Sequence, residues 1–233
     1  MDRRSVLSGL AATAAAAPLL SQAAARVPQS EPVVDTTGGK VRGLRRDGAY
    51  VFTCLPYGAT TAGEGRFLAP KPVVPWAGVR EEPRQRVIAP QVDPSAPAAV
   101  PGSPSAAVSG IGSEAGSLET EDCLNVTIFT PGLDSARRPV LFWCHGGGFY
   151  AGSGSAPMYD GAALAALGVV VVNVTHRLNV LGHLHLPESG PEFAASGNAG
   201  MQDIALALKW TRDNIERFGG DPKRVLVFGQ SGG

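Results

Sequence analysis

The chain has 233 residues, and its 20 Lys and Arg are balanced by 20 Asp and Glu, so the formal net charge is zero. This balance excludes a strongly basic protein that binds nucleic acid by displacing counterions from phosphates. With 44% hydrophobic and 17% charged residues, the chain is too apolar to be mainly disordered, and its length permits one domain with a sizeable core or two small ones.

The N-terminus has the pattern of an export signal. Arg3 and Arg4 precede an apolar, alanine-rich stretch, and the small residues 23–25 offer a cleavage site. This order is typical of a secretory signal peptide, and the arginine pair resembles a bacterial twin-arginine signal. A buried helix or membrane anchor is the alternative, but the stretch is short and Pro18 interrupts it. We expect residues 1–25 to direct export to the periplasm or outside the cell, with no membrane contact after cleavage.

The next two regions differ in composition. Residues 33–57 alternate short β-branched runs with Gly38-Gly39 and Asp47-Gly48, which favour tight hairpins and so predict an antiparallel meander. In residues 93–118, six Ala, six Ser, four Pro and four Gly make up 20 of the 26 residues. Such a segment cannot bury a core, so we expect a flexible surface loop near the mouth of a pocket, with a linker as the alternative.

The rest of the chain alternates strands with a helix. Residues 124–130, 140–144 and 169–174 predict strands, and the last run is almost entirely β-branched, which suits a strand buried on both faces of a parallel sheet. Six residues spaced by three and four predict one face of a helix that ends at Gly219-Gly220, before a further strand at 224–228. They are Met201, Ile204, Leu208, Thr211, Ile215 and Phe218. Strand, helix and strand predict a parallel α/β unit.

A candidate nucleophile lies in the last five residues, Gly229-Gln230-Ser231-Gly232-Gly233, which match G-x-S-x-G directly after a predicted strand. In this motif the serine sits on a tight turn with a strained backbone and an exposed Oγ. Side chains two positions before and after it would collide with neighbouring elements, which favours glycine there. The alternative is a glycine-rich turn with no catalytic role. We predict that Ser231 is a nucleophile.

A second motif, His145-Gly146-Gly147-Gly148-Phe149, follows the predicted strand 140–144. Three glycines let the backbone approach a ligand and turn its N–H groups toward a developing oxyanion. We expect the N–H groups of Gly147 and Gly148 to form an oxyanion hole together with that of Gly232. An ordinary flexible turn is the alternative.

These motifs belong to an ordered series that resembles the type B carboxylesterases, the cholinesterase-like branch of the α/β-hydrolases. The resemblance runs from about Val33 to Gly233. Its other marks are Leu55–Ala59, Arg66-Phe67, Glu121–Asn125, Asn198–Gly200 and Phe218–Pro222. It implies an α/β-hydrolase fold with a mixed, mostly parallel sheet and an N-terminal antiparallel meander, in which residues 26–233 form the N-terminal part of the domain. It also implies that Ser231 is the nucleophile and that Arg66–Glu121 and Arg177–Asp203 are buried structural ion pairs.

The chain departs from this family at several positions. Cys123 pairs with an upstream cysteine in many relatives, but the matching stretch 87–90 contains none, so we expect no such disulfide and leave a Cys54–Cys123 bridge as an alternative. Cholinesterases carry a tryptophan that holds a quaternary ammonium where this chain has Ser113, and a glutamate where it has Gln230. Both differences argue against a cationic substrate.

Other ligand motifs are weak. His183-Leu184-His185 would point its two rings to opposite faces of a strand, with no acidic or cysteine cluster nearby, so we expect no metal. We find no fingerprint for a dinucleotide or a phosphate, and expect no cofactor. Asn125 and Asn173 fit the N-glycosylation pattern but lie in predicted strands, so we interpret them as sheet residues.

We therefore expect hydrolysis of a small-molecule carboxylic ester by serine acyl transfer. The alternatives are a non-catalytic adhesion or binding module of the same fold, and amide hydrolysis by the same residues. In α/β-hydrolases the acid and the histidine of the triad follow the serine, whereas His145, His176, His183 and His185 all precede Ser231. We expect the acid and base beyond residue 233, so that this chain alone is an inactive fragment, truncated after the nucleophile turn, which exposes apolar strands such as 169–174 and aggregates.

Overall fold

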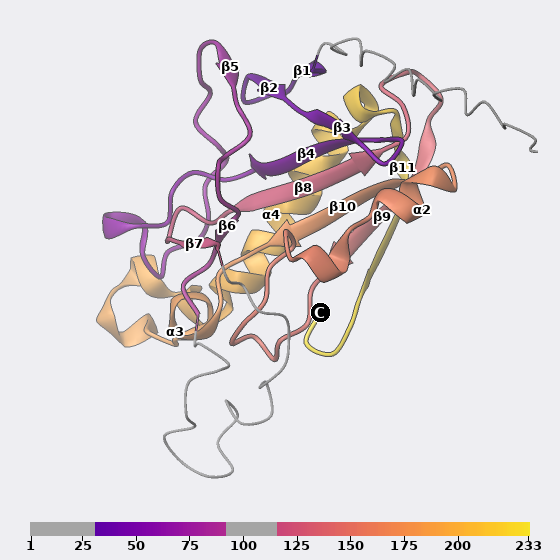
Figure 1. The fold of residues 1–233 in the computed structure, drawn as a ribbon. Helices are drawn as coiled ribbons and strands as arrows, with labels where there is room; N and C mark the ends of the chain where they lie inside the picture. The colour runs from indigo at the N-terminus through magenta and orange to yellow at the C-terminus, as the bar shows by residue number, and fades with distance from the viewer. Residues whose placement is uncertain (1–30, 92–115) are drawn as a thin grey trace, which may run out of the picture. The chain divides into compact units, whose positions relative to one another are not determined.

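The computed structural model describes residues 31–91 and 116–233, drawn in colour in Figure 1. The predicted signal peptide, residues 1–25, and most of the predicted loop, residues 93–118, lie outside this range. The loop prediction is wrong at its last residue, because Leu118 begins strand β7 (Leu118–Glu119), which pairs in parallel with β6 (Val87–Ile88). Among the described helices, none is both long and apolar enough to cross a membrane.

The predicted hairpins are confirmed, but they belong to two sheets. Strands β1 (Val33–Asp35) and β2 (Lys40–Arg42) pair antiparallel, and β5 (Val79–Arg80) completes their small sheet. Strands β3 (Leu44–Arg46) and β4 (Ala49–Pro56) pair around Asp47 and Gly48, whose φ angles are 51° and 83°. Two residues with positive φ form the tight turn that Asp-Gly favours.

The main sheet has six strands in the order β11-β9-β10-β8-β4-β3 (Figure 1). Strands β8 (Asn125–Thr130), β9 (Arg138–Cys144), β10 (Val170–Thr175) and β11 (Gly220–Gly229) confirm the strands expected from the sequence. The pairs β9–β10 and β9–β11 are parallel, whereas β8 runs antiparallel to both β10 and β4. The main sheet is therefore mixed, as expected, with three antiparallel and two parallel pairs among its described strands.

Helices cover both faces of this sheet. Helix α4 (Ala199–Asn214) lies behind the strands in Figure 1 and packs with Phe52 and Phe142 in the larger core. Helix α2 (Ala162–Ala166) packs against the opposite face with Phe129 and Val171. The remaining short elements are α3 (Asn179–His183), η1 (Gly63–Gly65), η2 (Pro157–Tyr159), η3 (Pro187–Ser189), η4 (Pro191–Phe193), η5 (Ser196–Asn198) and η6 (Ile215–Phe218).

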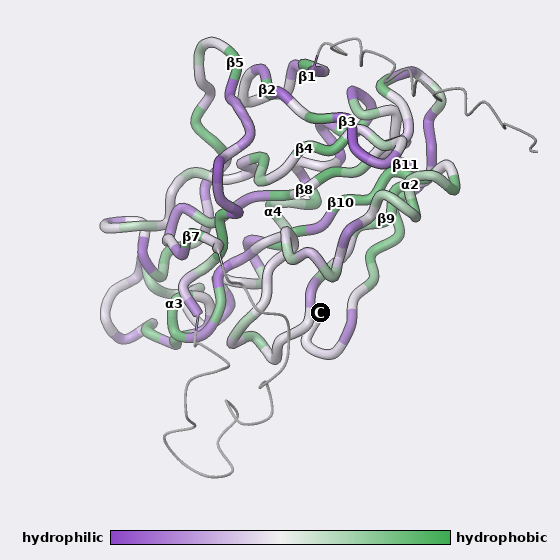
Figure 2. The backbone as a smooth tube through the Cα atoms, viewed as in Figure 1, coloured by the Kyte–Doolittle hydropathy of each residue, from purple (hydrophilic) through white to green (hydrophobic). Residues whose placement is uncertain are grey.

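The two helices correct the expectation that the run 169–174 is an exposed apolar strand. Every residue of β10 is buried, because the strand lies between β9 and β8 and is covered on both faces. The more exposed apolar residues of the main sheet lie instead on β11, where Leu226 is 59% and Val227 50% exposed. Figure 2 shows hydrophobic colour along this strand, which is an edge strand of the sheet in the described part of the chain.

Helix α4 and the turn η6 after it confirm part of the predicted face and add polar residues to it. The predicted residues Thr211, Ile215 and Phe218 are buried, and Met201, Ile204 and Leu208 are partly buried. The buried residues of α4 also include Asp203 and Asn214, which a hydrophobic pattern misses because they are polar. Both have partners inside the protein, since Asp203 binds Arg177 and the Asn214 side chain accepts the backbone N–H of Thr37 at 2.8 Å.

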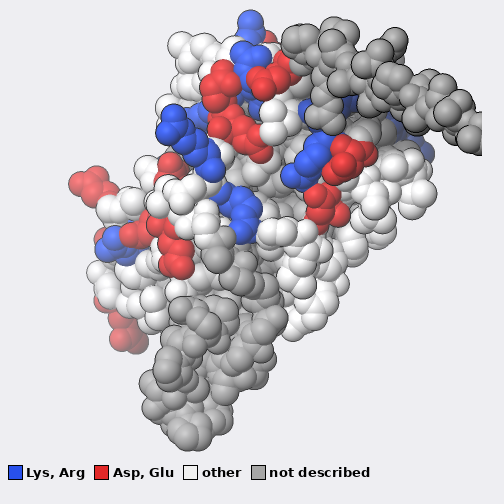
Figure 3. Space-filling model, in the orientation of Figure 1, with Lys and Arg blue, Asp and Glu red and all other residues white. Residues whose placement is uncertain are grey.

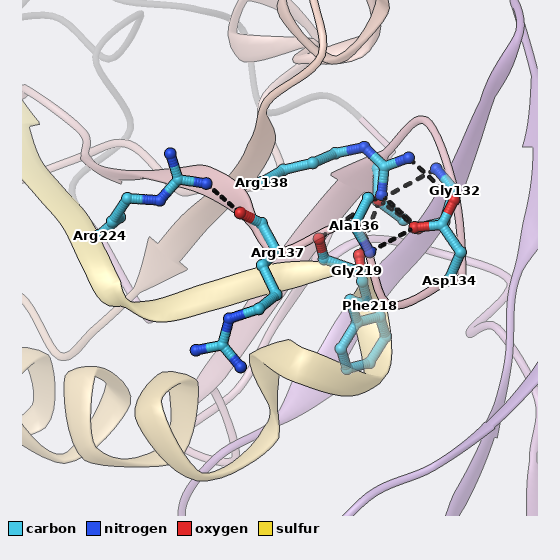
Figure 4. Close-up of polar contacts among 9 residues, drawn as sticks. Gly132, Asp134, Ala136, Arg137, Arg138, Phe218, Gly219 and Arg224 are labelled. Carbon is cyan, nitrogen blue, oxygen red and sulfur yellow. Dashed lines mark hydrogen bonds and ion pairs between the residues drawn. The ribbon is translucent and has the colours of Figure 1, made fainter.

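Polar contacts tie β9 and β11 together at their amino ends, as Figure 4 shows. The Arg138 guanidinium binds the Asp134 carboxylate through bonds of 2.6 and 2.9 Å, and the Arg138 backbone N–H donates to the Gly219 carbonyl at 2.9 Å. Arg224 donates to the carbonyl of Arg137. The register shifts between Gly220 and Val225, and from Val225 on the two strands pair in parallel up to their carboxyl ends, where Gly229 lies opposite Cys144.

On the face seen in Figure 3, acidic and basic side chains are interspersed and do not form large patches of one charge. The exposed ion pairs Arg42–Glu81 and Arg46–Asp160 are examples of this mixing. A mixed surface of this kind does not present the large basic patch that binding to phosphate backbones requires.

Candidate active site

The turn after β11, residues 229–233, is here called the serine turn. Ser231 is exposed and has a φ of 57°, a conformation that is strained for a residue other than glycine and that the motif predicted. The turn is closed by the backbone N–H of Gly233, which donates to the carbonyl of Gln230 at 3.0 Å. A Cβ on Gly229 would lie 2.5 Å from the Gly233 carbonyl carbon and 2.7 Å from the Cys144 oxygen, which explains the need for glycine.

The segment after β9, residues 145–152, is here called the glycine loop. Gly147, Gly148, Phe149 and Gly152 all have positive φ, at 118°, 59°, 64° and 102°. The backbone N–H groups of Tyr150 and Ala151 both donate to the Gly147 carbonyl, at 2.9 and 3.3 Å, and close a tight turn. The loop is thus an ordered turn in which the predicted glycines have the conformations that glycine permits.

The two turns are in contact. They follow neighbouring parallel strands, and a Cβ built on Gly232 would lie 3.2 Å from both the Cα and the backbone nitrogen of Gly148. The structure therefore brings the four predicted residues to one edge of the sheet, with Ser231 and Gly232 on one turn and Gly147 and Gly148 on the other. At the carboxyl edge of parallel strands, this is the usual position of ligand sites in α/β folds.

The first residue of the glycine loop, His145, packs against a second buried histidine, His176. The rings of His145 and His176 stack with centroids 4.9 Å apart, and each side chain is 2% exposed. The Nδ1 atom of His145 lies 2.8 Å from the Gly146 carbonyl oxygen, so this nitrogen carries the proton. Burial lowers the pKa of His145 to about 3 and that of His176 to about 4, with His176 lowering that of His145 further. Both rings are therefore neutral at pH 7.

A mainly apolar pocket of about 360 Å³ opens beside the glycine loop. Its seven lining residues are Gly148, Phe149, Tyr150, Asn179, Val180, His183 and Leu184. Phe149 is 41% exposed, and its ring meets that of His183 edge-on at 5.2 Å. Among the described residues, no acidic side chain lines this pocket, which suits an uncharged, apolar group.

One of the two predicted ion pairs is buried and the other is not. Arg177 and Asp203 are 2% and 0% exposed, and Asp203 accepts three bonds, from the Arg177 backbone N–H, Nε and Nη2 at 3.0, 2.9 and 2.7 Å. Arg66 and Glu121 are 46% and 20% exposed, so the prediction that this pair is buried is wrong. The Glu121 carboxylate still accepts a hydrogen bond from the Arg66 guanidinium, and this bond lowers the pKa of Glu121.

The remaining candidates are the cysteines and the His183-Leu184-His185 segment. Cys54, Cys123 and Cys144 are free thiols, so the alternative Cys54–Cys123 bridge is not formed. His183 ends helix α3 and His185 follows it in a loop, which corrects the prediction that both lie on a strand. Within residues 31–91 and 116–233, no group of three or more His, Cys, Asp and Glu side chains could hold a metal ion.

The sequence singled out neither Gln91 nor Asn179, although both bind the glycine loop. The Gln91 side chain accepts the N–H of Gly152 at 2.7 Å, and the Asn179 N–H donates to the Phe149 carbonyl at 2.7 Å. Asn179 has a φ of 46°, and an asparagine after a strand is a weak signal for such a conformation. Gln91 carries no local signal of its contact, which spans 61 residues.

Comparison with known proteins agrees with this geometry. Residues 30–233 match the model of the carboxylesterase family. The chain is 42% identical over 202 residues to the para-nitrobenzyl esterase of Bacillus subtilis, a match that covers 86% of this chain and 38% of that protein. It is 39% identical over 206 residues to the phenmedipham hydrolase of Pseudarthrobacter oxydans, covering 88% of this chain and 38% of that protein.

Solved structures give the same picture. The carboxylesterase EST55 of Geobacillus stearothermophilus superposes with a TM-score of 0.72 at 40% identity, covering 84% of this chain and 37% of that one. A para-nitrobenzyl esterase gives a TM-score of 0.75 at 38% identity, covering 87% and 39%. The chain therefore spans about two fifths of the length of these relatives, and it has their α/β-hydrolase fold. Since the family match extends over nearly all of the described residues, the chain belongs to the carboxylesterase family.

Proposed function

We propose that the complete protein is a serine carboxylesterase and that Ser231 is its nucleophile. The observation that carries this proposal is the contact of the two turns: a strained, exposed serine at the end of β11 lies beside a glycine loop at the end of β9. Membership of the carboxylesterase family supports ester hydrolysis as the reaction class.

The proposed reaction has two halves. Ser231 Oγ attacks the carbonyl carbon of the ester and gives its proton to a base, and the resulting oxyanion accepts hydrogen bonds from the N–H groups of Gly147, Gly148 and Gly232. Collapse of this intermediate expels the alcohol, which takes the proton, and leaves an acyl group on Ser231. Water then attacks the acyl group by the same route and releases the carboxylic acid.

The two buried histidines near the site do not suit the role of the base. His145 and His176 are buried, and their pKa values of about 3 and 4 make them poor bases at neutral pH. We propose that the acid and the histidine of the triad follow residue 233, in the chain order usual for this fold. Residues 26–233 alone would then lack the base and be inactive.

The substrate proposed for this site is a neutral ester with an apolar group. The pocket beside the glycine loop has an aromatic wall of Phe149 and Tyr150 and no acidic lining residue, and Gln230 next to the nucleophile is uncharged. A quaternary ammonium would find no counter-charge among the described residues of this pocket. The para-nitrobenzyl esterase and the phenmedipham hydrolase, to which the chain is similar, carry aryl groups in the names of their substrates.

A fluorophosphonate probe tests the nucleophile. In the complete protein we expect the probe to label Ser231, and a Ser231→Ala variant to lose labelling and about 10⁴- to 10⁶-fold in kcat for p-nitrophenyl butyrate. Ser189→Ala, a change at another exposed serine, is the matched control and should keep both. Absent labelling of the wild type would favour a non-catalytic binding module of the same fold.

A substrate panel tests the specificity. We expect kcat/KM to be higher for a neutral butyrate ester than for butyrylcholine, and higher for either ester than for the matching anilide. Faster turnover of the choline ester would contradict the proposed neutral pocket, and faster turnover of the anilide would make the protein an amidase.

We also propose that residues 1–25 are a twin-arginine-type signal that exports the protein. The support is the sequence pattern alone, with Arg3 and Arg4 ahead of a short apolar stretch. Fused to a reporter that folds before export, residues 1–30 should carry it across the bacterial inner membrane, and changing both arginines to lysine should stop it. Unchanged export of the lysine variant would indicate the general secretory route instead.

A further inference from the structure

The glycine loop is held at its far end by the side chain of Gln91. The Oε1 atom of Gln91 accepts the backbone N–H of Gly152 at 2.7 Å, and its Nε2 atom lies 3.4 Å from the Gly152 carbonyl oxygen as a donor. The same Nε2 donates to the Ala89 carbonyl at 3.1 Å, which fixes the amide in place. The Gln91 side chain thus binds both backbone groups of Gly152, since it accepts a bond from the N–H and donates one to the carbonyl oxygen.

Asn179 holds the middle of the same loop. Its backbone N–H donates to the Phe149 carbonyl at 2.7 Å, and its side-chain Nδ2 donates to the Pro90 carbonyl at 2.8 Å. Its Oδ1 accepts the N–H of Leu181 at 3.3 Å, so the side chain is held at both ends. Pro90 and Gln91 are consecutive residues. The bonds of Asn179 and Gln91 therefore form a closed circuit of contacts that starts at Phe149, passes through Asn179, Pro90 and Gln91, and ends at Gly152.

This circuit acts on a strained part of the backbone. Phe149 has a φ of 64°, which costs a residue with a Cβ about 1 kcal/mol or more, and it directly follows Gly148. Such backbone conformations persist only where contacts with residues outside the loop hold them in place. The contacts that Phe149 and Gly152 make through their backbone groups come from Asn179 and Gln91.

We propose that Gln91 and Asn179 are positioning residues for the oxyanion hole. They act through Gly152 and Phe149 to fix the backbone on the C-terminal side of Gly147 and Gly148, so that the two N–H groups are held in place before substrate arrives. The inference rests on the proposed function of the glycine loop, and it assigns to two amide side chains the pre-organisation that transition-state stabilisation needs.

The test uses the complete protein and three variants, with concentrations of active protein set by fluorophosphonate titration. Gln91→Met keeps the length of the side chain but removes both bonds, and Gln91→Glu keeps only the acceptor for the Gly152 N–H. Asn179→Gly keeps the positive φ and the backbone bond to Phe149 but removes the bond to Pro90. Gln202→Met, on helix α4 with its amide bonded to the Ala195 carbonyl, is the matched control.

For Gln91→Met we expect kcat with p-nitrophenyl butyrate to fall about 10- to 100-fold while KM stays within about threefold. The affinity for an aryl trifluoromethyl ketone, which forms a tetrahedral adduct with a serine, should fall by the same factor as kcat/KM. Gln91→Glu and Asn179→Gly should lose less, and Gln202→Met should match the wild type.

Two results would overturn the inference. If Gln91→Met had the kcat and ketone affinity of Gln202→Met, Gln91 would be a structural contact only. If Gln91→Met raised KM and the inhibition constant of the ketone by the same factor, Gln91 would affect substrate binding and not the oxyanion. A wild type that is labelled by no fluorophosphonate and hydrolyses no ester would instead overturn the proposed function itself, and this inference with it.

Discussion

The glycine loop and the serine turn follow neighbouring parallel strands, yet they are held very differently. His145, Gly146 and Gly147 are buried, and bonds from Gln91 and Asn179 hold the loop from outside. The serine turn is exposed at Ser231 and is closed by a single backbone bond from Gly233 to Gln230 within the turn.

This difference shows which half of the site the described residues build by themselves. The glycine loop rests on the covered part of the sheet, above the stacked pair His145–His176 and close to Arg177, which follows that pair in the chain. The serine turn rests on β11, an edge strand with exposed apolar residues. Changes beneath the glycine loop should therefore affect stability strongly, whereas changes at the serine turn and β11 should affect it little.

The largest expected effect is at the buried ion pair Arg177–Asp203, which directly follows His176 in the chain at Arg177. Asp203→Asn leaves the Arg177 guanidinium buried without its counter-charge, and should lower the free energy of unfolding by about 3–5 kcal/mol. Glu121→Gln breaks the half-exposed pair with Arg66 and should lower it by about 1 kcal/mol or less. Urea denaturation measures both values. Equal losses would mean that burial does not distinguish the two pairs.

The next effect compares one glycine from each turn. Gly147→Ala should abolish the ordered glycine loop, because φ is 118° and the added Cβ would lie 2.0 Å from the Ala151 carbonyl oxygen. We expect kcat to fall at least 10²- to 10³-fold, as for the loss of one oxyanion donor. Gly232→Ala places its Cβ 3.2 Å from Gly148, a contact that a shift of a few tenths of an ångström relieves, and kcat should fall less than about tenfold.

Steady-state kinetics of the complete protein, with circular dichroism to confirm folding, measures this pair of variants. A larger loss for Gly232→Ala than for Gly147→Ala would reverse the comparison, because the serine turn would then be the more tightly constrained of the two.

The four residues predicted to do chemistry could be found from the sequence because their motifs are local. Ser231 and Gly232 lie within five residues of chain, and so do Gly147 and Gly148, with the backbone conformation itself setting the residue types. The strands before each motif are short apolar runs, which periodicity detects. Their meeting at one edge of the sheet then follows from the parallel pairing of β9 and β11.

The residues that hold the glycine loop could not be found in this way, since their partners are far apart in sequence. Gln91 contacts Gly152 across 61 residues, and Asn179 contacts Pro90 across 89. A polar residue in a single sequence shows no sign of such a partner. The same reason explains why hydrophobic periodicity does not place Asp203 on the buried face of α4, since this residue is polar.

A smaller effect should appear in the pH dependence of stability. The pKa values of His145 and His176 fall from 6.5 in the unfolded chain to about 3 and about 4 in the folded protein. Below pH 6.5 the unfolded chain therefore binds protons that the folded protein does not, and the free energy of unfolding falls as pH drops toward these values. Each histidine contributes a slope of up to about 1.4 kcal/mol per pH unit.

Urea denaturation between pH 7 and pH 4.5 measures this slope. His176→Phe keeps an aromatic ring under the glycine loop and should make the slope shallower by up to about 1.4 kcal/mol per pH unit relative to the wild type. Carboxylates contribute equally to both proteins, so the difference isolates the histidine. An unchanged slope would mean that His176 is not held neutral by burial.

The smallest expected effect on stability is on β11, beneath the serine turn. Leu226→Thr and Val227→Thr replace exposed side chains with β-branched polar ones, and should change the free energy of unfolding by less than about 0.5 kcal/mol each. Val172→Thr on the covered strand β10 is the matched control, and its buried hydroxyl should cost about 1–3 kcal/mol.

The two β11 variants should instead reduce self-association of residues 31–233, because an apolar edge strand is a template for pairing. Light scattering and sedimentation measure that association. A loss of stability at Leu226→Thr as large as that at Val172→Thr would show that β11 is covered in the folded chain, and the contrast between the two turns would then be false.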